Sequence, residues 1–212
     1  MKQQGILVVV SGFSGAGKGT LMKALLAKYD NYALSISATT RQPREGEEDG
    51  REYFFKTVEE FEQLIDNDEL IEYAKYVDNY YGTPKAYVES QLESGKDVIL
   101  EIEIQGALKV KAKRPDTVLI FVTPPSAEEL KNRLIGRGTE TMDVIKSRLR
   151  RASEEAEGMN GYDYVLINDD LDECVDELHA IIVGEHNAAG RKEAFINKVT
   201  EELKGIMKGE EI

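Results

Sequence analysis

The sequence predicts an α/β fold, in which a doubly wound parallel sheet is covered by helices on both faces. Short, unbroken apolar runs are typical of parallel strands, because such strands are buried on both sides. These runs are followed by apolar residues at helical spacing, and strands that alternate with helices form a parallel sheet. The runs that we predict as core strands span residues 6–10, 98–104, 118–122 and 164–167.

The intervening helices are predicted from their apolar spacing and their caps. After the third strand, residues 126–129 (Ser-Ala-Glu-Glu) form a capping box for a helix. The polar, glycine-flanked loop 136–141 that follows is typical of a mobile lid between two helices. From about Asn187 onward, the charged tail predicts a terminal helix that frays. The apolar positions of the first helix are Leu21, Met22, Leu25 and Leu26.

One segment breaks this alternation and predicts an inserted subdomain. Residues 35–94 hold short mixed strands, a helix capped by Thr57 with Glu60 three positions later, and a second helix introduced by Thr83 and Pro84. We therefore expect a single domain in three parts. The core comprises residues 1–34, 95–132 and 152–212, the insertion residues 35–94, and the lid residues 133–151.

Composition excludes several classes of protein. A formal net charge of −13 in 212 residues argues against a nucleic-acid-binding surface, because such surfaces neutralise phosphates with Lys and Arg. No run is long enough to span a bilayer, and the first residues lack the pattern of a secretory signal. The single cysteine, Cys174, agrees with a reducing compartment. We expect a cytoplasmic protein with no membrane or nucleic-acid partner, and a homo-oligomer is left open.

Residues 12–18 match the phosphate-loop pattern G-x-x-x-x-G-K, between a predicted strand and a predicted helix. Backbone N–H groups of such a loop surround the phosphates of a nucleotide, and its lysine reaches the outer phosphates. The motif predicts a P-loop NTPase fold that binds a nucleoside triphosphate. Gly19 stands where Ser or Thr is usual, so Thr20 is the expected hydroxyl for Mg²⁺. The residues expected to bind this nucleotide are Gly12, Phe13, Ser14, Gly15, Ala16, Gly17, Lys18, Gly19 and Thr20.

A second phosphate site is predicted in the insertion. The phosphate loop alone leaves the reaction open, because GTPases, motors, transporters and kinases share it. Arg41 and Arg44 stand three apart around Pro43, and this stiff, extended arrangement can hold one phosphate from two sides. Glu72 and the segment 79–83 add a carboxylate and several hydroxyl groups. The insertion therefore favours a phosphorylated small molecule as the second ligand.

The chain resembles the guanylate kinases over nearly its whole length. The resemblance implies a three-part nucleoside-monophosphate kinase that transfers the terminal phosphoryl group of ATP to GMP, and to dGMP, with ATP and Mg²⁺ as cofactors. The segments that carry the resemblance are SGAGKGT (14–20), S-x-T-T-R-x-P-R (37–44), GREYFF (50–55), 72–83 with its NYYGT, EIEIQGA (101–107), GRGTET (136–141) and INDDL (167–171).

The resemblance also implies roles for single residues. Glu101 resembles the acidic position that organises Mg²⁺ through its waters, with a glutamate where many phosphate-loop enzymes have Asp. Asn168 and Asp169 correspond to positions near adenine. The GMP phosphate would be held by Arg41, Arg44, Tyr53 and Tyr81, and guanine would be faced by Ser37, Glu72, Thr83 and Glu103. The chemistry of guanine agrees, because a carboxylate accepts from its two adjacent N–H donors whereas adenine presents an acceptor there.

Catalysis of this kind needs positive charge and no acid–base triad. The acceptor is an anionic phosphate oxygen, so the enzyme aligns two phosphates and stabilises the charge that moves between them. Arg150 and Arg151 are interpreted as a solvated helix face, and His179 and His186 as packing or surface residues. The predicted clamp consists of Lys18, Arg41, Arg44, Arg133, Arg137 and Arg148, with Arg133 and Arg137 also on the ATP side.

Three alternatives belong to other functional classes. A peptide-binding scaffold module is disfavoured, because such modules lack a working phosphate loop and here Lys18 and its glycines are intact. A GTPase switch is disfavoured because the Asn-Lys-x-Asp motif that reads the base is absent. A kinase with another acceptor, such as AMP or a phosphorylated sugar, conflicts with the set of residues expected to face guanine.

Overall fold

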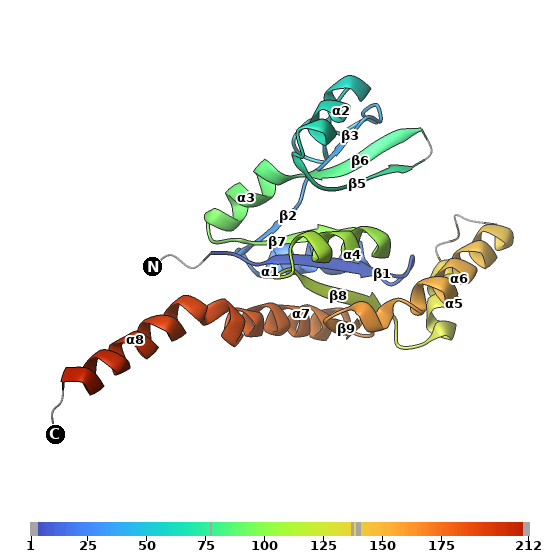
Figure 1. Cartoon of the computed structure of the whole chain (residues 1–212). Helices are drawn as coiled ribbons and strands as arrows, with labels where there is room; N and C mark the ends of the chain where they lie inside the picture. The colour runs from blue at the N-terminus through green and yellow to red at the C-terminus, as the bar shows by residue number, and fades with distance from the viewer. Residues whose placement is uncertain (1–3, 77, 137, 139–140, 210–212) are drawn as a thin grey trace.

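The computed structural model describes residues 4–76, 78–136, 138 and 141–209 (Figure 1). Within them, a five-stranded sheet in the order β2-β7-β1-β8-β9 forms the core, and all its neighbouring strands are parallel. This confirms the predicted doubly wound α/β fold. The strands are β1 (Leu7–Gly12), β2 (Tyr32–Leu34), β7 (Asp97–Glu101), β8 (Val118–Thr123) and β9 (Tyr164–Ile167).

Helices cover both faces of this sheet, which explains why its strands are apolar without interruption. Along β1, Val8 and Val10 pack on one side, whereas Leu7 and Val9 pack on the other, and all four are buried. The first side is covered by α1 (Lys18–Lys28) and α7 (Leu171–Glu185), and the second by α3 (Lys85–Glu93) and α4 (Ile104–Lys113). Cys174 is buried on the α7 side, and burial raises the pKa of its thiol to about 11.

A second, smaller sheet lies above the core in Figure 1, and its strands fall within residues 35–94. In the described part of the chain it has four strands in the order β4-β3-β6-β5, packed on a small cluster of Ala38, Phe61 and Leu70. The predicted Thr57 and Glu60 capping box is present at the start of α2. The elements are β3 (Ser37–Thr39), β4 (Tyr53–Phe55), α2 (Val58–Asp66), β5 (Leu70–Tyr76) and β6 (Asn79–Pro84).

At one end of the core sheet, α5 (Ala127–Gly136) and α6 (Met142–Ala156) project to the side (Figure 1). The Glu129 N–H donates to Ser126 Oγ at 3.0 Å, as predicted for a helix cap, while the Glu129 carboxylate accepts from Arg133. Residues 137, 139 and 140 of the predicted lid loop lie outside the described residues. The predicted boundary at 151 and 152 falls inside α6.

The last helix, α8 (Glu193–Gly209), extends away from the core (Figure 1). A short 3₁₀ turn, η2 (Ala189–Lys192), directly precedes it, and a second one, η1 (Met159–Gly161), lies between α6 and β9. Several of its apolar side chains are exposed, among them Phe195, Leu203 and Met207. In the part of the chain that the structure describes, no helix has both the length and the apolar character needed to cross a membrane.

The strand predicted at 98–104 is too long. β7 ends at Glu101, and α4 begins at Ile104 with Glu103 as its N-cap. The apolar residues Ile102 and Ile104 continue the pattern of the strand, but the Ile102 carbonyl accepts from the Ser11 hydroxyl at 2.7 Å instead of a neighbouring strand. The chain leaves the sheet at this bond. The segment from the end of β7 to the start of α4 places the carboxylates of Glu101 and Glu103 along one cavity with residues of the phosphate loop.

A buried carboxylate at the start of β7 joins the core sheet to the end of α7. Asp97 is 3% exposed and accepts from the Ile6 N–H and from His186 Nε2, each at 2.8 Å. Asp97→Ala is expected to lower the free energy of unfolding by about 2–4 kcal/mol, because it leaves buried donors without an acceptor. Urea denaturation followed by circular dichroism would measure this. Asp176→Ala removes a surface carboxylate and is the control, and equal losses in both variants would contradict the prediction.

Candidate functional site

The phosphate loop lies between β1 and α1, where its backbone is held open by glycine. Gly17 has a φ of 90°, and a Cβ there would lie 2.5 Å from the amide nitrogen of Asn168. That nitrogen donates to the Ala16 carbonyl at 2.8 Å, and Asn168 is buried. Asn168 therefore supports the phosphate loop, and its neighbour Asp169 is exposed.

Lys18 is the first residue of α1, and its side chain folds back over the loop. Its Nζ donates to the carbonyl oxygens of Gly12 at 2.7 Å and Phe13 at 3.3 Å. The ammonium group thus lies at the mouth of the loop, close to where the outer phosphates of a bound nucleotide would be. Loop and lysine together form the anion site that the sequence predicts.

Two cavities of about 570 Å³ and 380 Å³ meet at this loop, and Ser14, Lys18 and Glu101 line both. The smaller cavity also contains the exposed Thr20 and extends over the N-terminus of α1. The oxygen atoms of Thr20 and Glu101 are hard donors that fit Mg²⁺. Burial raises the pKa of the Glu101 carboxyl, and the neighbouring Lys18 partly opposes that rise.

The small sheet brings together three of the residues predicted to hold the second phosphate, and this centre consists of Arg41, Tyr53 and Tyr81. The Arg41 guanidinium lies 5.3 Å from the centre of the Tyr53 ring, and the Tyr53 and Tyr81 ring centres are 6.1 Å apart. Strand pairing explains the grouping, because β3, which leads to Arg41, lies between β4 and β6. Arg44, whose side chain is exposed, lies on the loop that follows β3.

Glu47 fixes Arg41 in this centre, although the sequence did not reveal it. Both Glu47 carboxylate oxygens accept from Arg41 Nη2, at 2.9 Å and 3.0 Å, and one of them also accepts from the Arg44 N–H at 2.8 Å. The Arg44 N–H and the Arg41 guanidinium together hold the pKa of the Glu47 carboxyl below its usual range. The carboxylate is therefore ionised at neutral pH and orients Arg41.

Glu72 and Thr83 form a polar pair inside the insertion. The Thr83 hydroxyl donates to Glu72 Oε1 at 2.8 Å, and Thr83 is fully buried. Burial raises the pKa of the Glu72 carboxyl, while the Thr83 hydrogen bond and the charges of Lys109 and Lys113 oppose the rise. Ser37, at the start of β3, lies opposite Tyr53 in the same sheet. The single hydrogen of the Thr83 hydroxyl is used in the bond to Glu72, and the Glu72 carboxylate keeps further acceptor capacity.

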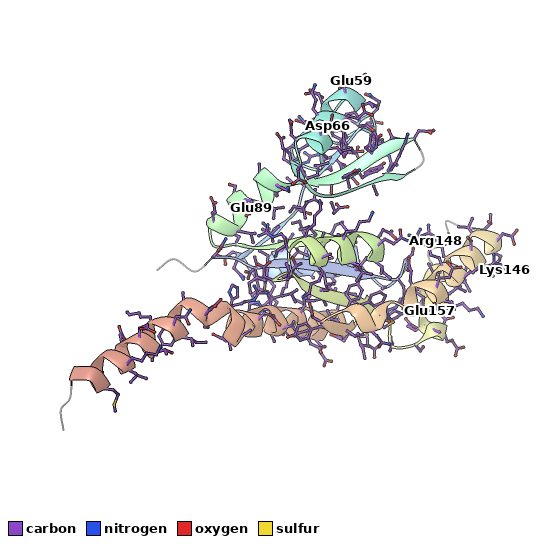
Figure 2. The ribbon with its side chains drawn as sticks, in the orientation of Figure 1. Glu59, Asp66, Glu89, Lys146, Arg148 and Glu157 are labelled. Carbon is purple, nitrogen blue, oxygen red and sulfur yellow. The ribbon has the colours of Figure 1, made fainter. Side chains whose placement is uncertain are left out.

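The lid-side arginines occupy different places. Arg148 of α6 contacts the Ser14 hydroxyl of the phosphate loop, and Figure 2 shows it on the side of α6 that faces the core. Arg133 donates to Glu129 on its own helix at 2.7 Å, and Arg137 lies outside the described residues. The side chain of Arg151 is exposed, which agrees with its interpretation as part of a solvated face. Arg151 lines the larger cavity and contacts Glu103, because it stands one helical turn after Arg148 on the same face of α6.

Comparisons with known proteins agree with this geometry. The family model described as guanylate kinase matches residues 4–185. The guanylate kinase of Caldanaerobacter subterraneus subsp. tengcongensis is 54% identical over 202 residues, which cover 95% of this chain and 98% of that protein. The Bacillus subtilis guanylate kinase is 52% identical over 187 residues, covering 88% and 92%. The crystal structure of guanylate kinase from Anaplasma phagocytophilum aligns with a TM-score of 0.66 at 35% identity and covers 87% of each chain.

Proposed function

We propose a role for each residue of the site. The chain belongs to the guanylate kinase family and transfers the terminal phosphoryl group of ATP to GMP, and the proposed roles proceed from that reaction. The observation that supports this assignment best is the pairing of two anion sites in one molecule. Lys18 and the phosphate loop form one, and Arg41 with its two tyrosines forms the other. We assign GMP and dGMP as acceptors and the cytoplasm as the compartment, and we retain the division into core, insertion and lid.

The donor nucleotide binds across the phosphate loop. The loop N–H groups and Lys18 hold the phosphates of ATP, and the N-terminus of α1 adds its positive dipole end. Thr20 and Glu101 are the residues that would hold Mg²⁺, Glu101 through water. When bound, the metal ion neutralises the charge of the donor phosphates. Arg148 already contacts the loop through Ser14, and it adds positive charge beside the transferred group.

The acceptor binds in the insertion. Its phosphate is held by Arg41 and Arg44 together with the hydroxyls of Tyr53 and Tyr81. Its base lies against Glu72, which accepts from the two adjacent guanine donors, while a hydroxyl group donates to the guanine O6. Ser37, Thr83 and Glu103 complete the base-facing set. An adenine base would present a lone pair to the Glu72 carboxylate, and this mismatch discriminates by about 10⁴ or more.

Phosphoryl transfer then requires alignment more than acid–base chemistry. The attacking oxygen of the GMP phosphate carries a negative charge, so no base has to remove a proton. Lys18, Arg41, Arg44 and Arg148 hold the two anions in line and stabilise the charge that spreads over the transferred group. Each chain residue in this step acts through position and charge.

The acceptor site depends on Glu47, because that carboxylate orients Arg41. Glu47→Gln is expected to raise KM for GMP roughly 10-fold with a smaller change in kcat, since the neutral amide weakens a charge-assisted contact. Steady-state kinetics with GMP as the varied substrate measure the effect. Glu45→Gln, an exposed neighbour in the same loop, is the control. A lower KM in the Glu47 variant would mean that Glu47 competes with the phosphate for Arg41.

A panel of acceptors tests the proposal as a whole. Purified protein with ATP and Mg²⁺ is offered GMP, dGMP, AMP and CMP, and ADP formation is followed in a coupled assay. We expect turnover with GMP and dGMP at least about 10³-fold above AMP in kcat/KM. Turnover that is equal for GMP and AMP would contradict the roles given to Glu72 and Thr83.

A further inference from the structure

The face of α6 that borders the larger cavity carries a second arginine. Arg151 lies one turn after Arg148, whereas Arg150 between them is exposed on another face. The α6 residues that line the cavity of about 570 Å³ are Val144, Ser147, Arg148, Arg151 and Glu155. Arg151 therefore differs from Arg150 in position although the two adjacent residues carry the same charge.

Arg151 joins two carboxylates from different elements. Its Nε donates to Glu155 Oε1 of the same helix at 2.8 Å, and its Nη2 contacts Glu103 Oε2 at the N-cap of α4. The bridge borders two cavities, because Glu103, Arg151 and Glu155 line both the larger one and a neighbour of about 250 Å³. In this structure, Glu103 is therefore engaged with the lid helix.

Glu103 also lies near the proposed base-binding site. Gly106, one turn later in α4, lies so close to Glu72 that a Cβ there would be 3.5 Å from Glu72 Oε2. The N-terminal turn of α4 thus connects the two carboxylates, and a base held by Glu72 would lie beside Glu103. While its Oε2 contacts Arg151, the Glu103 carboxylate cannot turn both of its oxygens toward the base.

The ion pair between Arg151 and Glu103 is exposed, and an exposed ion pair is weak enough for a competing ligand to break it. The two side chains are 56% and 70% exposed, and exposed ion pairs contribute about 0.2–1 kcal/mol. Such a pair adds little to folding stability, yet it is strong enough to bias the position of Glu103. Glu155, whose side chain is only 17% exposed, keeps Arg151 in place when Glu103 leaves.

We propose that Arg151 is a positioning residue that holds Glu103 against α6 in the ligand-free enzyme, so that binding of GMP has to break this contact. The inference rests on the proposed role of Glu103 in facing guanine. It couples the acceptor site to the lid helix through one side chain. Removal of the Arg151 charge should therefore free Glu103 and strengthen the binding of GMP.

A double-mutant cycle tests the coupling. Arg151→Gln is expected to lower the Kd for GMP about threefold, which matches the energy range of an exposed ion pair. Glu103→Gln weakens GMP binding, and in that background Arg151→Gln should bring no gain. Titration calorimetry without ATP gives the four Kd values. KM for GMP should fall in Arg151→Gln while KM for ATP stays unchanged, a split that a general structural defect would not produce.

Two further variants sharpen the experiment. Arg150→Gln removes the same charge one residue away and should leave the Kd for GMP unchanged. Arg151→Lys keeps the charge and should restore most of the wild-type Kd. The inference is overturned if Arg151→Gln binds GMP as the wild type does or more weakly, or if its gain persists beside Glu103→Gln. If the wild-type chain itself does not bind GMP, the proposed function is contradicted. Failure of the proposed function can thus be told apart from failure of the role given to Arg151.

Discussion

Replacing Lys18 with alanine is expected to lower kcat for transfer from ATP to GMP by about 1,000-fold or more. The ammonium group lies over the phosphate loop, bound to the Gly12 and Phe13 carbonyls, and in the proposed mechanism it stabilises the charge of the moving phosphoryl group. An alanine at the first position of α1 keeps a good helix former there. The folded chain should therefore persist while the chemical step is lost, and a coupled assay of ADP formation measures that loss.

A matched control separates the chemistry from the fold. Lys28→Ala removes an equal charge from the other end of α1, where the lysine pairs with Asp176 at the surface. We expect near-normal kcat in that variant and similar thermal melting for both. Retention of more than about a tenth of wild-type kcat by Lys18→Ala would contradict the role given to this lysine. Loss of the folded signal in circular dichroism would assign Lys18 a structural role instead.

Local patterns predicted the parts of the fold that local interactions determine. β1, β8 and β9 lie within a residue or two of their predicted bounds, because apolar runs covered on both sides are visible in sequence. β2 was missed because its apolar run, Tyr32–Leu34, is only three residues long, shorter than the runs that predicted the other strands. β7 was extended too far because the bond that ends it joins Ser11 to Ile102, 91 positions apart.

In the site too, the features set by contiguous residues were predicted, whereas those set by distant residues were not. The phosphate loop is contiguous, so its residues were predicted from spacing alone. The proposed acceptor site is assembled by strand pairing, for example Ala38 opposite Gly82. Spacing predicted a phosphate site at Arg41 and Arg44, whereas the roles of the other residues came from the resemblance to guanylate kinases. Arg151 contacts Glu103, which lies 48 positions away, whereas Glu47 is only six positions from Arg41 but belongs to no pattern that predicts this contact. Helical spacing from Arg148 could have placed Arg151 on the cavity face, but nothing local indicated Glu103 as its partner.

The Glu72→Gln variant is expected to lower kcat/KM for GMP by roughly 1,000-fold or more while KM for ATP changes little. The amide keeps the shape of the side chain, but it turns one acceptor into a donor that faces a guanine N–H. The variant also loses its preference for GMP over AMP, since that preference comes from the carboxylate. Kinetics with each acceptor check both effects. Glu69→Gln, an exposed position just before β5, is the control and should behave as the wild type.

Burial raises the pKa of the Glu72 carboxyl in the folded chain, so we expect this group to make both folding stability and KM for GMP depend on pH. A folded-state pKa above the unfolded value means that the folded chain holds the proton to higher pH. Stability from this group is therefore present at low pH and is lost as pH rises through the folded pKa. GMP needs the ionised form, so KM for GMP should rise as pH falls through that same raised pKa.

Glu72→Gln removes both dependences at once. The ligand-free variant should melt at a higher temperature than the wild type at neutral pH, because a buried carboxylate is replaced by a neutral amide that the Thr83 hydroxyl can still donate to. Differential scanning calorimetry at several pH values checks this, and the gain should shrink as the wild-type carboxyl becomes protonated. A lower melting temperature in the variant would mean that the ionised Glu72 stabilises the insertion. A higher one, together with lost activity towards GMP, would mean that this position trades folding stability for recognition of guanine.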